Sequence, residues 1–272
     1  MLGNLARLIR YRGLIQTLVA RELKARYRGS VLGFFWSFIN PLLLLLIYTY
    51  VFAYIMPRNL PPGQDPKPFS DPYPYALFLF CGLLPWTWFS SSLNESAGVL
   101  ISGGNLIKKV LFPAEVLPIV TVLANMVHFF LGLPILAAFL AYYRAPVTIG
   151  ELVWFPVIVL VQLLFTLGLA LIVAALTVHF RDIRDILANV LMLWFFATPI
   201  IYPWTQAPDV GKWFVNVNPF SHLAISYQEV LFFIGPFGHW RWLLSLGAAS
   251  LVFFLFAYFI FDRLRDTFAE EV

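Results

Sequence analysis

The fold of this chain is decided by residues 21–56, RELKARYRGSVLGFFWSFINPLLLLLIYTYVFAYIM. Its first eight positions carry four basic residues and one acid: Arg21, Lys24, Arg26, Arg28 and Glu22. From Val31 to Met56 no residue is charged. An apolar helix of about 20 residues crosses the hydrocarbon core of a bilayer, so this run is long enough for a span. Because basic residues favour the cytoplasmic side, the stretch also predicts the orientation of the chain.

The composition is typical of an integral membrane protein. Hydrophobic residues make up 61% of the chain and charged residues 12%, against about 25% charged in soluble domains. The basic balance does not predict nucleic-acid binding, because the Lys and Arg residues stand at helix ends and form no aromatic-interleaved patch. Cys81 is the only cysteine, which excludes a disulfide framework within the chain. Arg7, Arg10 and Arg12 interrupt any early apolar core, so we expect no cleavable signal peptide.

Apolar runs along the chain predict an all-α membrane protein with a single transmembrane domain over residues 1–272. The six predicted transmembrane helices cover residues 31–56, 73–101, 114–143, 152–178, 186–205 and 241–262. Asn40-Pro41 predicts a kink in the first of them. Residues 57–72 are rich in proline and polar groups and predict an irregular external loop.

Residues 5–28 predict an amphipathic helix that lies in the cytoplasmic interface. Apolar residues such as Leu8, Ile15 and Leu18 fall on one half of a helical wheel, and most of the basic residues fall on the other. A helix packed on a partner protein is the alternative. Gly29 and Gly33 then permit a bend into the first span.

Residues 209–240 predict a re-entrant external helix pair before the last span. Trp213–Gln228 and Val230–Trp240 are each apolar but too short to cross the membrane separately. Broken backbone cannot face lipid, so both segments must pack on protein or line a partly wet cavity.

The distribution of basic residues supports six spans with both termini inside. Five of the 18 Lys and Arg residues would lie outside: Arg58, Lys67, Arg144, Lys212 and Arg241. The other 13 would lie inside, as the positive-inside rule requires.

Few residues point to chemistry. The chain has no phosphate-binding loop motif, no H-E-x-x-H and no Cys/His cluster with metal-ligand spacing. His128 in the third span is most simply a packed neutral histidine. Glu95, at the inner end of the second span, has two open interpretations: a buried functional carboxylate or an acid exposed at the interface.

Several blocks of sequence resemble one family of bacterial permeases. Arg21–Phe52 is similar to the opening of the membrane subunits of ATP-binding-cassette exporters of O antigen, capsule and wall teichoic acid. Gly82–Pro118, with GLLPWTWFSSSLNES and NLIKKVLFPAEVLP, resembles the same family. FRDIRDI at 180–186, TPIIYP at 198–203 and NPF at 218–220 follow in the expected order. The resemblance covers almost the whole chain.

This resemblance implies a homodimer of the permease bound to two copies of a separate nucleotide-binding ATPase. ATP and Mg would then belong to the ATPase, and the chain itself would bind no cofactor or metal and would be no enzyme alone. Short internal helices at Asn105–Phe112 and Phe180–Ile186 are the expected contacts with the ATPase. The candidate residues are Asn105, Leu106, Ile107, Lys108, Lys109, Phe112, Arg181, Asp182, Arg184 and Asp185. For Lys108 and Lys109, positive-inside anchoring remains an alternative.

The family also implies a polymer carried on a polyprenyl pyrophosphate lipid, exported across the bacterial cytoplasmic membrane. A glycan presents hydroxyls and flat CH faces, which suit aromatic walls. Candidate conduit residues are Phe34, Phe35, Trp36, Trp86, Trp88 and Phe89. With two copies near a dimer axis, the re-entrant pair would close the external mouth, and its candidate gate residues are Asn218, Pro219, Phe220, Ser221 and Ile225.

Two other functions stay open. A membrane-embedded prenyl-diphosphate transferase would use Asp182 and Asp185 to hold Mg²⁺, although Arg181 and Arg184 neutralise this pair. The other is an exporter of drugs or lipids from the same superfamily.

Overall fold

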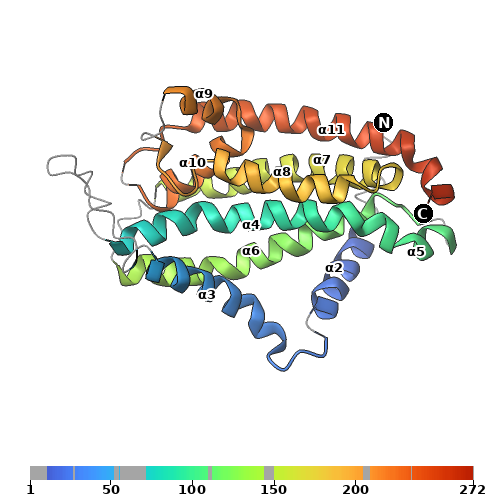
Figure 1. Cartoon of the computed structure of the whole chain (residues 1–272), viewed down its shortest axis with the longest axis horizontal. Coiled ribbons are helices and arrows are strands. Elements are labelled where there is room, and N and C mark those ends of the chain that lie inside the picture. Colours follow the sequence, from blue (N-terminus) through green and yellow to red (C-terminus); the bar gives the residue numbers. More distant parts are fainter. Residues whose placement is uncertain are drawn as a thin grey trace.

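Helices make up all the regular structure in the described part of the chain, as the sequence predicts. The computed structural model describes residues 11–26, 28–51, 55, 72–109, 112–143, 150–204, 209–233 and 235–271. The elements, drawn in Figure 1, are α2 (Arg12–Arg26), η1 (Gly33–Phe35), α3 (Trp36–Tyr50), α4 (Pro72–Ser102), α5 (Gly104–Lys109), α6 (Val116–Tyr142), η3 (Glu151–Trp154), α7 (Phe155–His179), α8 (Ile183–Ala197), α9 (Asp209–Val217), α10 (Pro219–Leu231) and α11 (Trp240–Glu271).

Four helices are long and apolar enough to cross a membrane. They cover Tyr75–Ser102, Val116–Tyr142, Glu151–His179 and Trp240–Arg265, close to four of the six predicted spans. The described parts of the other two predicted spans, α3 and α8, are helices of 15 residues each. At 1.5 Å per residue each is about 22 Å long, less than the hydrocarbon thickness of about 30 Å.

The long helices lie side by side along the long axis of the molecule (Figure 1). Within the apolar window of α4, 83% of the residues are buried, against 28% for α11, so α4 is central and α11 peripheral. A close approach of α7 and α11 depends on Gly168, where an added Cβ would lie 2.7 Å from Cδ1 of Phe253.

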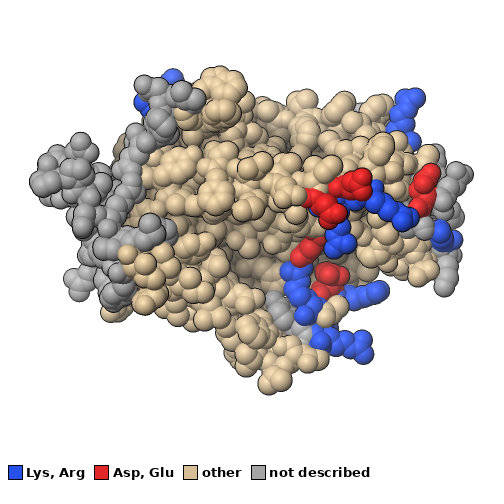
Figure 2. Space-filling model, in the orientation of Figure 1, with Lys and Arg blue, Asp and Glu red and all other residues tan. Residues whose placement is uncertain are grey.

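The connections between the helices fall at two ends of the bundle. One end holds α5, the start of α8 and the C-terminal part of α11 (Figure 1). Figure 2 shows Lys, Arg, Asp and Glu gathered towards this end of the visible face. We call it the internal end, because it carries the connections that the sequence assigns to the cytoplasm. The opposite, external end holds α9 and α10.

The N-terminal helix crosses the others at a steep angle (Figure 1). It is described only over α2, since residues 1–10 and 27 lie outside the described residues. Its half-buried side chains include Ile15 and Leu18, and its predicted position in the interface stays a prediction. Gly29 (φ 81°) and Gly33 (φ 49°) adopt left-handed backbone conformations that support the predicted bend. The first span therefore begins as an α-helix at Trp36 and not at Val31, which corrects the prediction.

The fifth predicted span, 186–205, needs correction at both ends. Helix α8 begins at Ile183, so the predicted short helix Phe180–Ile186 is a turn followed by the first residues of α8. The helix ends at Ala197 because Thr198 is extended (ψ 138°), as expected for a residue before proline.

The external helix pair exists, but with a different boundary. Helix α9 ends at Val217 and α10 begins at Pro219, so the break lies at Asn218 and not at Glu229. Asn218 caps α10 by accepting a hydrogen bond from the Phe220 N–H, and proline suits the first helical position. Helix α10 is almost wholly buried against α4, α7 and α11, which confirms that this segment packs on protein. The predicted loop 57–72 lies almost entirely outside the described residues.

Candidate functional site

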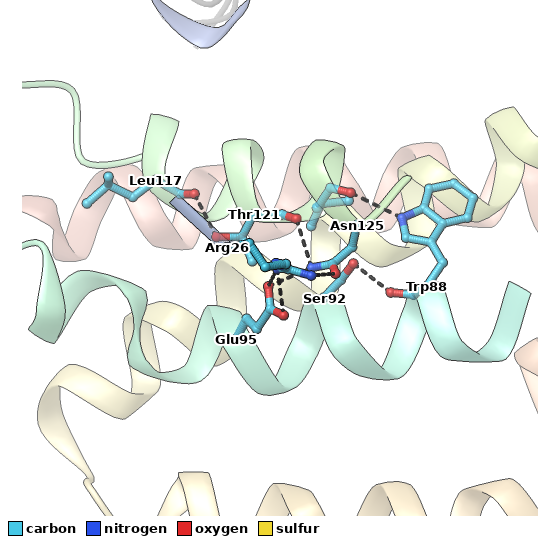
Figure 3. A network of polar contacts seen from close by, with 8 residues as sticks. Arg26, Trp88, Ser92, Glu95, Leu117, Thr121 and Asn125 are labelled. Carbon is cyan, nitrogen blue, oxygen red and sulfur yellow. Dashed lines mark hydrogen bonds and ion pairs between the residues drawn. The ribbon is translucent and has the colours of Figure 1, made fainter. Parts of the chain in front are cut away.

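An ion pair joins the N-terminal helix to the bundle (Figure 3). The Arg26 guanidinium of α2 donates from Nη2 to both oxygens of Glu95 on α4, at 2.9 and 2.7 Å. The side chains are 28% and 39% exposed, so water partly screens the pair. Glu95 is therefore a paired carboxylate at the edge of the bundle. It is neither the buried acid nor the fully exposed acid that the sequence left as alternatives.

Asn125 of α6 completes this polar network. Its Nδ2 donates to Glu95 Oε2 at 2.7 Å, and its Oδ1 accepts from Arg26 Nη1 at 3.2 Å. The same amide donates to the Thr121 carbonyl. Two turns before Glu95 on α4, Trp88 donates to the Val122 carbonyl at 3.1 Å. The network ties α2 to α4 and α6 at once, and we call it the Arg26 tie.

A groove of about 590 Å³ opens beside the Arg26 tie, between α2, α3, α4 and α6. Figure 2 shows a hollow on this face with charged residues at one margin. Its walls include Trp36, Asn40, Thr87, Trp88 and Phe129. Since Glu95 neutralises Arg26, a ligand in the groove would meet aromatic rings and uncharged polar groups.

The predicted conduit residues separate into two sets. Trp36 and Trp88 both line the groove, and Trp36 donates to Ser30 Oγ at 3.0 Å. Phe35 is 69% exposed, and the side chain of Phe34 lies outside the described residues.

Trp86 and Phe89 belong to a buried aromatic cluster and not to an open wall. Phe220 of α10 meets both of them, with ring centroids 5.0 Å from Trp86 and 4.7 Å from Phe89. Trp194 of α8 packs edge-on against Phe89 at 5.3 Å. Two predicted conduit residues and one predicted gate residue therefore meet in the core that joins α4, α8 and α10. This corrects their expected exposure within the chain.

The other predicted gate residues are also hydrogen-bonded or buried within the chain. Asn218 Oδ1 accepts from Trp194 Nε1 at 2.7 Å, and its Nδ2 donates to Thr198 Oγ1 at 2.9 Å. Ser221 and Ile225 are 0% and 2% exposed, so neither side chain is available to a second copy. Helix α9, by contrast, exposes three apolar side chains: Trp213, Phe214 and Val217.

The predicted ATPase contacts lie together at the internal end. The side chains of Asn105, Leu106 and Lys108 on α5 are exposed, and Phe112 is half-buried. All four charged residues of the turn before α8 and its first turn are exposed: Arg181, Asp182, Arg184 and Asp185. The side chains of Ile107 and Lys109 lie outside the described residues. In the described ranges, no three His, Cys, Asp or Glu side chains are grouped as a metal site.

A buried histidine pair at the external end was missed by the sequence reasoning, which had no spacing rule to connect them. His222 Nε2 lies 3.0 Å from the Asn216 carbonyl, and a carbonyl can only accept. The Nδ1 of His222 therefore accepts from His239 Nε2, 2.9 Å away. Glu229 accepts from the backbone N–H of Gly238 and of His239, both at 3.1 Å. Burial, with the neighbouring His222 as a second cause, lowers the pKa of His239 to about 4.

The Arg26 tie could not be found from the sequence either. Its ion pair joins residues 69 positions apart, and no sequence pattern connects them. Each residue stood out separately, Arg26 as part of a basic cluster and Glu95 as an acid beside an apolar run.

Comparison with known proteins agrees with the resemblance. Residues 13–232 match the family described as ABC-2 type transporter. The chain is 42% identical over 275 residues to an O-antigen export system permease protein, RfbA, of Myxococcus xanthus, with 100% of both chains covered. It is 32% identical to an RfbA of Klebsiella pneumoniae over 94% of both chains. It is 26% identical to the polysialic acid transport protein KpsM of Escherichia coli over 80% of both.

Proposed function

Because the chain belongs to the ABC-2 type transporter family, we propose that it is the membrane subunit of an ATP-driven polysaccharide exporter. Its cargo is a polyprenyl-pyrophosphate-linked polysaccharide or polyol-phosphate polymer, of the O-antigen or wall teichoic acid type. The observation that carries this proposal is the similarity to an O-antigen export permease over the whole of both chains. The membrane crossed is the bacterial cytoplasmic membrane.

The transporter contains two copies of this chain and two copies of an ATPase subunit that holds ATP and Mg²⁺. Support comes from the internal end, where α5 and the turn before α8 expose polar and charged side chains to a partner. A rigid surface of this kind is what ATP-driven closure of the ATPase subunits must push against.

Six spans with both termini inside remain part of the proposal, with α3 and α8 as the two short ones. Exposed apolar side chains on α8, including Met192, Leu193 and Phe196, support contact with lipid or with a second copy. Helices α9 and α10 form the re-entrant external segment. The gate moves to the exposed α9 residues Trp213, Phe214 and Val217, because α10 is buried within the chain.

Proteoliposomes that contain this chain and its ATPase subunit test the proposal. We expect ATP hydrolysis and ATP-dependent transfer of lipid-linked polymer across the bilayer only when both subunits are present. A prenyl-diphosphate transferase would instead consume polyprenyl diphosphate without ATP. An exporter of drugs or lipids would move those compounds and leave the polymer behind. Either of these results would overturn the proposal.

A further inference from the structure

The last helix continues past its apolar part. Helix α11 has 32 residues, and the part that is long and apolar enough to cross a membrane is Trp240–Arg265. The remaining turns therefore lie at the internal end, where Figure 1 shows the C-terminal part of α11 near α5. The two helices are in contact.

One side chain of this extension, Phe268, is fully buried, with 0% of its surface exposed. Its ring packs against Phe261, with centroids 5.2 Å apart at 69°. It also lies 6.2 Å from the ring of His179, the last residue of α7. The adjacent Thr267 places its hydroxyl 3.4 Å from His179 Nε2. The extension is thus fastened to the end of α7 by two neighbouring residues.

The apolar cluster that contains Phe268 also includes residues next to both internal connections, α5 and the turn before α8. Leu100 and Ala114 flank α5, and both belong to the cluster that contains Phe268. Val178, another member, comes just before the turn that leads into α8. At the junction of α4 and α5 the chain is tightly packed, since a Cβ on Gly103 would lie 2.6 Å from Leu117 Cδ1. Phe268 therefore belongs to the same packed cluster as residues beside both connections.

We propose that the C-terminal end of α11, through Phe268, is a buttress that holds α5 and the turn before α8 in fixed relative positions. Phe268 is a positioning residue, because it is buried behind the surface that the ATPase would touch. By keeping α5 and the turn before α8 rigid, it allows motion of the ATPase to reach the transmembrane helices. This inference rests on the proposed function for its effect on transport, and on packing alone for its effect on rigidity.

Hydrogen–deuterium exchange tests the packing claim without any transport assay. Phe268→Leu keeps an apolar side chain but removes the ring contacts. We expect backbone exchange in residues 104–109 and 180–186 to rise about tenfold, with no change in α10. The matched control is Phe259→Ala on the same helix, a side chain that is 48% exposed and outside the cluster. Unchanged exchange in both connections, or a rise in only one of them, would overturn the proposal.

Transport by the full complex tests the functional claim. We expect Phe268→Ala to lower the polymer exported per ATP hydrolysed by about fivefold or more. Phe268→Leu should recover part of this ratio, and Phe259→Ala should keep the original ratio. If the ratio of polymer exported to ATP hydrolysed does not change in Phe268→Ala, the buttress does not couple hydrolysis to export. If the unaltered complex exports no polymer, the proposed function fails, and exchange in the two connections still decides the buttress.

Discussion

At the external end of the bundle, breaks between helices are closed by side chains of the same protomer. The Pro199 carbonyl, just past the end of α8, accepts a hydrogen bond from Gln228 Nε2 at 2.9 Å, and Gln228 is 1% exposed. The Tyr75 hydroxyl donates to the Ile201 carbonyl, and Asn218 joins Thr198 to Trp194. The internal end has equally short connections, yet α5 and the turn before α8 point their polar side chains outward.

This difference follows from what each end has to face. In the proposed topology the external segment lies at membrane depth, where each unsatisfied backbone group costs several kcal/mol, so its helix breaks must be closed by protein. The charged side chains described on α5 and on the turn before α8 stay exposed, where water or a partner can satisfy them. The helix breaks at the external end are therefore closed within the chain, whereas the polar surface of α5 and of the turn before α8 is available to a partner. Phe268 lies buried behind that surface.

The largest expected effect comes from removing the cap of α10. Asn218→Ala leaves the Trp194 and Phe220 N–H groups without their acceptor. We expect a loss of about 3 kcal/mol in the free energy of unfolding, measured in detergent micelles. The control is Asn216→Ala, because that side chain is exposed and only its backbone carbonyl binds His222. Similar losses in the two variants would mean that the external end does not depend on this closure.

The buried histidine pair makes the external end sensitive to acid. The unfolded chain protonates His239 near its ordinary pKa of 6.5, but the folded chain does so only near pH 4. The unfolded state therefore binds more protons in this window, and stability falls as pH falls through it. His222, whose pKa burial also lowers, acts in the same direction, and Glu229, whose pKa burial raises, partly opposes both.

Replacing His239 should remove its share of this acid sensitivity. Between pH 7.5 and 5.5 we expect His239→Gln to reduce the loss of unfolding free energy by about 1 kcal/mol. Thermal unfolding across this pH range provides the measurement. Asn216→Ala, which removes no titratable group from the same end, is the control and should leave the pH profile as it is. An unchanged profile for His239→Gln would show that the pair does not titrate in this way.

The smallest effect is expected from the Arg26 tie, because its side chains are partly exposed. A double-mutant cycle with Arg26→Met and Glu95→Gln should give a coupling energy of about 0.5 kcal/mol. Proteolytic release of α2 in detergent offers an independent readout, and both single variants should speed it equally. Additive effects on stability would show that the ion pair does not hold α2 to the bundle.

Much of the fold could be predicted from the sequence, for a physical reason. The spans that became α4, α6 and α7 are charge-poor runs longer than the membrane thickness, and their predicted ends lie within three residues of the observed ones. The sequence predicts that the first span begins at Val31, but α3 begins at Trp36. This difference depends on the left-handed backbone at Gly29 and Gly33, a conformation that glycine permits but does not require.

Prediction failed where long-range packing decides the outcome. The sequence places a helix break at Glu229, but this residue lies within α10, and two backbone N–H groups donate to its carboxylate and offset the cost of its burial. The local signal at Asn218-Pro219 pointed to the correct boundary, since asparagine caps helices and proline begins them. Trp86 and Phe89 were assigned to a conduit because aromatic residues suit sugars, and only their contacts with Phe220 place them in the core.

The most direct test of the central claim is site-specific photo-crosslinking at both ends of the bundle in whole cells. A photoreactive residue at Lys108 or Asp182, both exposed at the internal end, should capture the nucleotide-binding subunit. The same residue at Lys212 or Trp213 on exposed α9 should capture none of it. Capture at the external positions, or its absence at both internal ones, would contradict the assignment of the internal end as the surface that meets the ATPase.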